Sequence, residues 1–130
     1  MKQAIEFTGI GGIYMISSTI DWPGENPLED IRKAVDAQVV TVVSLREPTQ
    51  DRLGLDMWLD DEGLYSSDSP QIWNMVFGND VITPVAGGHF LILGVDMDGN
   101  SHGLSNAEAT AAMLLTQFIP FGGVLPKFGE

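Results

Sequence analysis

Short apolar stretches separated by turn residues dominate the first half of the chain. Residues 3–7 and 13–17 have the pattern of two short strands, and the glycine-rich stretch 9–12 between them predicts a turn. Residues 39–45 are β-branched and almost entirely apolar, which favours an inner strand. Residues 55–59 predict a further strand that runs directly into an acidic turn.

A second pair of apolar stretches lies in the C-terminal half. Residues 81–85 and 89–95 flank Ala86-Gly87-Gly88, and this arrangement predicts a β-hairpin. The run Phe90 to Val95 is apolar throughout, so we expect both of its faces to be covered. Asp98-Gly99 then predicts a tight turn.

Three segments have the residue spacing and the capping residues of helices. The first covers residues 26–37, with Asn26 as its cap. The second begins at Ser69-Pro70 and covers residues 69–77. The third covers residues 105–119 and opens on the capping box formed by Ser105 and Glu108.

The order of these predicted elements is β-β-α-β-β-α-β-β-α. This order indicates an α+β fold in which a mostly antiparallel or mixed sheet packs with about three helices. The length of 130 residues suits one domain, and a hydrophobic fraction of 44% is enough for a core. We therefore expect a single compact domain over residues 1–120 and an irregular tail over residues 121–130.

The charge of the chain narrows the classes of partner. There are 18 acidic residues and 6 basic ones, which leaves a net charge of −12. The span from Leu53 to Pro126 contains no Lys or Arg. Direct binding of nucleic acid or of an anionic membrane is therefore not expected, and a partner with a basic surface is favoured. Simple solubility explains the same charge equally well.

The amino-terminal residues and the absence of cysteine bear on the compartment. Without cysteine the chain can form no disulfide, thiolate metal site or cysteine nucleophile. Residues 1–6 do not have the pattern of a signal peptide, because Glu6 falls where an apolar core would run. The apolar stretches are too short to cross a bilayer. These features indicate a cytoplasmic protein.

Two glycine- or aspartate-rich motifs have partial matches to ligand-binding loops. Asp96, Asp98 and Asn100 have the spacing of a calcium loop, but such a loop also needs a glycine at its sixth position and a glutamate at its twelfth. The stretch 9–12 is similar to a dinucleotide-binding turn, but its third glycine is replaced by Tyr14. Plain turns are the favoured interpretation of both, so no metal and no cofactor is expected.

No group of residues predicts catalysis. The stretch Gly103 to Ala107 is faintly similar to a nucleophile elbow, but Ser105 already serves as a helix cap. Neighbouring carboxylates in a turn, such as Asp60 and Asp61, are usually only solvated. Neither His89 nor His102 has an obvious partner for binding a metal. We therefore expect a protein that is not an enzyme.

Part of the chain resembles a known family. The motifs lie between Leu55 and Ala109 and comprise Gly54-Leu55-Asp56, Asp60-Asp61-Glu62-Gly63, Asn79-Asp80-Val81-Ile82, Leu93-Gly94-Val95-Asp96, Asp98-Gly99 and Gly103-Leu104-Ser105-Asn106-Ala107-Glu108. In these motifs the chain resembles a small domain of unknown function found in phage and plasmid proteins. The resemblance implies a mobile-element context and supplies no catalytic residues.

These observations favour a phage or mobile-element accessory protein that binds and modulates a host protein with a basic surface. A sharper hypothesis is an anti-defence inhibitor, a DNA mimic whose acidic face imitates nucleic acid. The alternatives are a structural module that forms homo-oligomers and a small enzyme. The candidate partner-binding residues are Asp60, Asp61, Glu62, Asp68, Trp22 and Trp73. For the two tryptophans, a place in the core is the competing interpretation.

Overall fold

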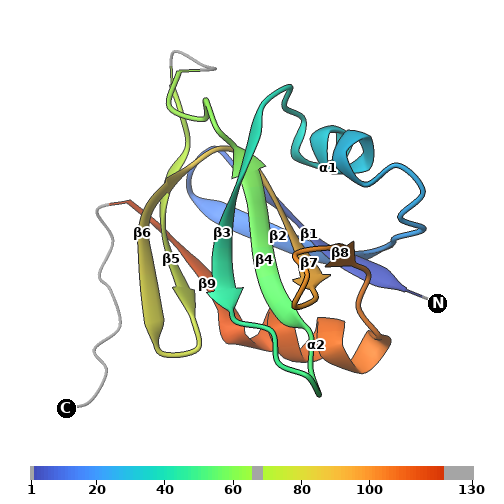
Figure 1. Ribbon diagram of the computed structural model, residues 1–130. Helices are drawn as coiled ribbons and strands as arrows, with labels where there is room; N and C mark the ends of the chain where they lie inside the picture. Colours follow the sequence, from blue (N-terminus) through green and yellow to red (C-terminus); the bar gives the residue numbers. More distant parts are fainter. Residues whose placement is uncertain (1, 66–68, 122–130) are drawn as a thin grey trace.

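Strands make up most of the secondary structure in the computed structural model, which describes residues 2–65 and 69–121 (Figure 1). The described residues form nine strands and two helices. In chain order they are β1 (Gln3–Ile10), β2 (Tyr14–Asp21), α1 (Pro27–Val35), β3 (Val40–Arg46), β4 (Gly54–Asp60), β5 (Ile72–Phe77), β6 (Asp80–Ala86), β7 (His89–Val95), β8 (Ser101–His102), α2 (Asn106–Leu115) and β9 (Thr116–Pro120).

The strands belong to two sheets. The strand order of the first sheet is β2-β1-β7-β4-β3, and β8 pairs with the end of β7. The strand order of the second sheet is β6-β5-β9. Every ladder between these strands is antiparallel. Helix α1 and the second sheet lie on opposite sides of the first sheet (Figure 1).

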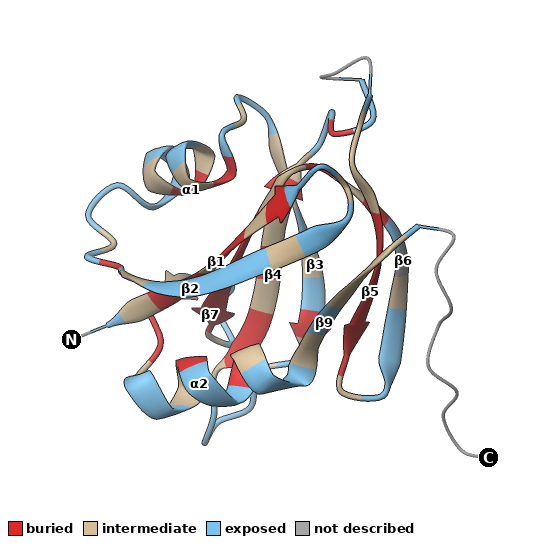
Figure 2. Ribbon diagram, turned by 180° about the vertical axis from the view of Figure 1, so that it is seen from behind, coloured by how far each residue is buried: buried red, intermediate tan, exposed pale blue. Residues whose placement is uncertain are grey.

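The central strand β7 is buried on both faces (Figure 2). Phe90 and Ile92 belong to a core cluster shared with the second sheet and α2. Leu91 and Leu93 point the other way and pack in a second cluster beneath α1. The expectation that both faces of this run are covered is confirmed, and the cover comes from the same chain.

The prediction of an α+β fold with about three helices is wrong. The protein is mostly an antiparallel β-structure with two short helices. Residues 72–77 lie in the second predicted helix but form β5 instead. Five of these six residues are buried, because β5 lies between β6 and β9 and packs its side chains into the core. A short run of mostly apolar residues cannot be assigned to a helix or a strand from its periodicity alone.

The predicted hairpin of residues 81–85 and 89–95 is also wrong. Strand β6 pairs with β5 in the second sheet, whereas β7 crosses to the first sheet and pairs with β1 and β4. The two strands differ in the polarity of their residues. Because β7 is apolar on both faces it suits a central position, while β6 carries Asp80 and Pro84 and occupies an edge.

The ends of both helices differ from the prediction. Asn26 stands at the N-cap position of α1, but its side chain makes no capping hydrogen bond. Helix α2 ends at Leu115, and residues 116–120 continue directly as β9. The Thr116 hydroxyl donates to the Ala112 carbonyl at 2.8 Å and so satisfies a group at the helix end. The predicted tail lies outside the described residues from residue 122 onward.

The capping box of α2 is confirmed. The Glu108 amide donates to the Ser105 hydroxyl at 3.2 Å, and the Ser105 amide donates to the Glu108 carboxylate at 3.0 Å. These bonds also hold the pKa of Glu108 below its usual value, chiefly through the backbone hydrogen bond from Ser105. Neither helix within the described residues is long and apolar enough to cross a membrane.

Ser105→Ala is expected to lower the free energy of unfolding by about 1 kcal/mol, because it leaves an amide of the first turn without its acceptor. Chemical denaturation followed by circular dichroism measures this loss. Ser17→Ala, on the exposed strand β2, is the control and should change stability by less than about 0.5 kcal/mol. Equal stability of the two variants would contradict a capping role for Ser105.

Candidate functional site

The acidic turn that follows β4 is held in one conformation by backbone and side-chain hydrogen bonds. The Asp60 carboxylate accepts the Glu62 amide at 2.9 Å, and the Asp60 carbonyl accepts the Gly63 amide at 3.2 Å. The Asp61 amide donates to the Val39 carbonyl at 3.0 Å, which ties the turn to the start of β3. Asp61 and Glu62 are exposed, so the turn presents their carboxylates to solvent in a defined place.

Gly63 anchors the acidic turn to the second sheet. It is buried, and a Cβ atom at this position would overlap the carbonyl of Ala86 at the end of β6. Only glycine allows the two backbones to approach so closely. The carboxylates therefore stand at a fixed place beside the gap between the two sheets.

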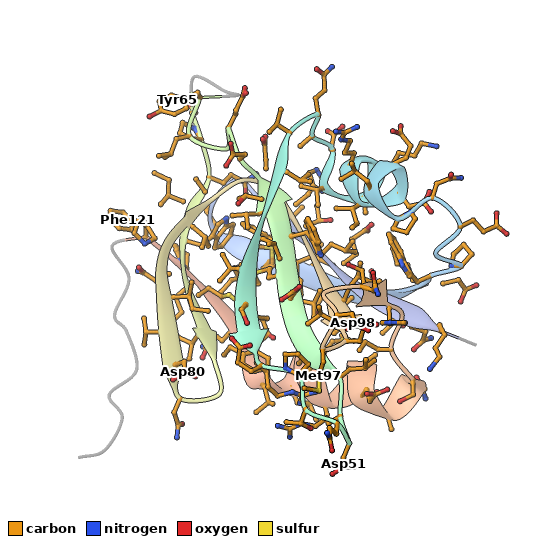
Figure 3. The ribbon with its side chains drawn as sticks, in the orientation of Figure 1. Asp51, Tyr65, Asp80, Met97, Asp98 and Phe121 are labelled. Carbon is orange, nitrogen blue, oxygen red and sulfur yellow. The ribbon has the colours of Figure 1, made fainter. Side chains whose placement is uncertain are left out.

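An apolar groove with a volume of about 360 Å³ lies next to this turn. Its walls come from two edge strands, with Thr41 and Val43 on β3 and Ile82 and Pro84 on β6. Leu64, Tyr65 and Phe121 also line it, and these three side chains are exposed by 49%, 85% and 61%. Figure 3 shows Tyr65 and Phe121 on the same side of the molecule.

The charge at the groove has a single sign. Asp60 and Asp61 line the end of the groove, and no Lys, Arg or His is among the described residues that line it. A ligand with apolar groups and positive charge therefore fits this surface better than an anionic one. The acidic part of this site was predicted from the sequence, but the groove was not.

The two candidate tryptophans lie in the core. Trp73 has no exposed surface, and its Nε1 donates to the Gly87 carbonyl at 3.0 Å. Trp22 is 6% exposed and packs beneath α1 with Ile31. The competing interpretation of these residues, as core side chains, is the one that the structure supports. Asp68, the remaining candidate, lies outside the described residues.

The glycine-rich stretch 9–12 has a structural explanation. Gly11 and Gly12 have φ angles of 61° and 71° and form the turn between β1 and β2. The Gly12 amide donates to the Gln71 side-chain oxygen at 3.0 Å. A Cβ at Gly9 would come within 2.7 Å of the Trp73 ring. These contacts account for the glycines without a nucleotide.

The turn that was compared with a calcium loop uses its first aspartate within the protein. The Gly99 amide donates to the Asp96 carbonyl at 3.1 Å, which makes a β-turn as predicted. The Asp96 carboxylate accepts the amides of Asp98 and Asn100, both at 2.9 Å, and its second oxygen lies 2.6 Å from His102 Nε2. Within residues 2–65 and 69–121, no cluster of three or more Asp, Glu or His side chains could hold a metal ion.

The pairing of Asp96 with His102 was missed because it depends on β8. The register pairs His102 with Gly94 and Ser101 with Val95, the last residue of β7. Asp96 follows Val95 directly, so the pairing brings His102 close to it. The hydrogen bond from His102, followed by the bond from the Asn100 amide, holds the pKa of Asp96 below its usual value. A carboxyl group whose pKa is lowered by folding stabilises the folded state at higher pH, and this contribution is lost as the pH falls through the folded-state pKa.

His102→Ala is expected to raise the pKa of Asp96 toward that of an unperturbed aspartate, because the hydrogen bond that is the largest cause of the lowering is removed. An NMR titration of the carboxyl carbon of Asp96 measures this value. Asp80→Asn, a change at an exposed carboxylate on β6 in the second sheet, serves as the control and should leave the Asp96 titration unchanged. An Asp96 pKa that is the same with and without His102 would show that the pair does not form in solution.

No known protein family, curated protein or solved structure matches the chain. The resemblance to a phage and plasmid domain therefore stays a prediction from the sequence.

Proposed function

We propose that this protein binds a partner protein, without catalysis, through the acidic turn of residues 60–62 and the apolar groove beside it. The observation that carries the proposal is the combination of exposed carboxylates, on a turn that hydrogen bonds hold in place, and a groove that, among the described residues, no cation lines. A partner with a basic and partly apolar surface satisfies both halves of the site. Binding surfaces commonly combine an apolar centre with a polar rim.

The charge of the whole chain supports the same class of partner. A net charge of −12 attracts a basic surface over a distance and raises the rate of association. It repels anionic membranes and the phosphates of nucleic acids. A host protein with a basic surface, met in the cytoplasm by a mobile-element protein, fits these preferences.

The distribution of the acidic residues favours a local docking site over a long face that imitates nucleic acid. Figure 3 shows Asp51 at the opposite end of the molecule from Tyr65, which follows the acidic turn. Asp98 and Asp51 belong to the loops at that far end, where both line a separate hollow. An anti-defence inhibitor of this architecture would act through one local contact with its target rather than along an extended face.

The alternative of an oligomerisation module loses its main support. That hypothesis was based on the need to cover both faces of residues 90–95. Helix α1 and the second sheet provide this cover within one chain. The groove beside the acidic turn is therefore a better candidate for an interface than β7 is.

The test compares two triple variants with equal net charge. The first, Asp60→Asn, Asp61→Asn and Glu62→Gln, removes charge from the turn, and the side-chain oxygen that remains at position 60 can still accept the amide at position 62. The second, Asp51→Asn, Asp80→Asn and Asp98→Asn, removes three exposed charges elsewhere. Each immobilised protein captures proteins from a lysate of the source cell, and the rate of association of the captured partner is measured at low and high salt.

We expect the turn variant to bind the captured partner more slowly and with a weaker dependence on salt, because exposed charges are screened over about 8 Å at physiological ionic strength. The control variant should behave like the unmodified protein apart from a smaller general effect of net charge. If both variants lose the same amount of binding, the charge acts only through its total, and the proposed site is wrong.

A further inference from the structure

We propose that the groove between β3 and β6 receives an extended peptide segment of the partner, with alternating apolar and basic side chains, which adds as a strand to the free edge of β3. This inference rests on the proposed function and specifies how the partner is recognised. Strand addition of this kind takes its affinity from backbone hydrogen bonds and its specificity from the pockets that receive alternate side chains.

Strand β3 has the features of an edge that can accept another strand. Within the described residues it is the last strand of the first sheet and pairs with β4 alone. An edge strand leaves a row of amides and carbonyls without partners in the sheet. Residues 40–45 contain neither a charged residue nor a proline, the two features that commonly protect an edge. Most of β3 therefore lacks the residues that usually prevent the addition of a strand.

Strand β6, which forms the other wall, is unsuited to the same role. Pro84 lies in its middle and has no amide to donate. The pairing of β6 with β5 is also irregular between Trp73 and Met75. The groove side of β6 therefore offers side-chain contacts from Ile82 and Pro84, while β3 offers the backbone edge.

The register of β3 explains why the side chains of the peptide should alternate. Thr41 and Val43 pair with Leu59 and Met57, which belong to the core between the sheets, so they face the groove. Ser44 pairs with Asp56, whose side chain lies on the opposite face. A strand added beside β3 directs alternate side chains into the groove and toward the face that carries Asp56, so apolar side chains suit the first direction and basic ones the second.

Charge favours a foreign peptide over a second copy of this chain as the occupant of the groove. The span from Leu53 to Pro126 contains no Lys or Arg, so a second copy would offer few basic side chains to this acidic site. The segment of residues 122–130 follows Phe121, which lines the groove, and it contains Lys127. That segment is the main competing occupant, and the experiment includes it.

Three synthetic peptides of about ten residues, enough to span the seven residues of β3, serve as probes. The first alternates Val and Lys, the second Val and Glu, and the third Ser and Lys. We expect the Val/Lys peptide to bind at least about 10-fold more tightly than either of the others, measured by calorimetry. We also expect slower hydrogen exchange of the β3 amides when this peptide is bound.

A matched pair of variants locates the binding. Thr41→Arg places a cation in the groove and should weaken binding of the Val/Lys peptide about 10-fold or more. Thr19→Arg makes the same change on β2, the opposite edge of the first sheet, and should leave the affinity within about 2-fold. If Thr41→Arg fails to fold, the exchange of the β3 amides in the unmodified protein decides the question.

The outcomes separate the failure of this inference from the failure of the proposed function. If the Ser/Lys peptide binds as tightly as the Val/Lys peptide, and only the acidic-turn variant weakens it, the groove is not the site but the basic partner remains. A chain truncated after Phe121 is tested with the same peptides. If only this truncated chain binds the Val/Lys peptide, residues 122–130 occupy the groove of the full chain and the inference is overturned. If neither the peptides nor the lysate partner respond to the acidic-turn variant, both proposals fail.

Discussion

Trp73→Ala is expected to lower the free energy of unfolding by about 3–5 kcal/mol, the range typical of removing a large aromatic side chain from a core. Trp73 has no exposed surface, and Phe118 packs against it with the ring centroids 6.2 Å apart. The substitution opens a cavity between the two sheets. It also leaves the Gly87 carbonyl without the indole donor that now satisfies it. Chemical denaturation measures the loss.

Trp73→Phe separates the two parts of this effect. It keeps an aromatic ring in the core but removes the donor to Gly87, so we expect a smaller loss of about 1–3 kcal/mol. Neither substitution should change binding of the Val/Lys peptide at temperatures where the variants stay folded. If stability were unchanged and binding were lost, Trp73 would be a partner-binding residue, and its assignment to the core would be wrong.

Leu93→Ala is expected to lower the free energy of unfolding by about 2–5 kcal/mol. Leu93 is fully buried in the cluster beneath α1, together with Leu91, Ile31 and Val35. The loss should be the same at low and high protein concentration, because α1 of the same chain covers this face of β7. Denaturation curves recorded over a wide range of protein concentration measure both quantities.

Ile92→Ala is the matched control on the opposite face of the same strand. Ile92 is also fully buried, but it packs against the second sheet and α2. We expect a loss in the same range, again independent of concentration. If the effect of Leu93→Ala alone depended on concentration, another copy of the chain would be covering that face, and the oligomerisation hypothesis would be favoured again.

Half of the candidate site could be predicted from the sequence. The acidic turn of residues 60–63 was recognised, because carboxylates next to a glycine form a local signal. The groove was not recognised, since its walls come from Thr41 and Val43 and from Ile82 and Pro84, which belong to edge strands of different sheets. No pattern within one segment indicates which edges will face each other across a gap.

The structural role of Trp73 was likewise undecided by the sequence. Its indole donor meets Gly87, a residue 14 positions away, only because β5 and β6 pair. Tryptophan is common both in cores and in interfaces, so its type alone does not separate the two.

Features whose hydrogen bonds or burial are local follow from the amino-acid sequence alone. These include the cap of α2 at Ser105, the turn at Asp98-Gly99, the apolar strand of residues 89–95 and its need for cover on both faces. A capping box closes within four residues, and alternation or its absence can be read along one strand. The acidic excess is likewise a property of composition.

The pairing of the strands, and the choice of which apolar run becomes a strand, depend on the folded chain as a whole. Residues 72–77 form β5 because β6 and β9 supply its backbone partners, and those partners lie in other parts of the sequence. Likewise, β7 pairs with β1 and β4 rather than with β6, and both of its apolar faces are buried in this position. Pairing across a sheet is non-local, so it follows from the burial that the whole fold achieves rather than from any one segment.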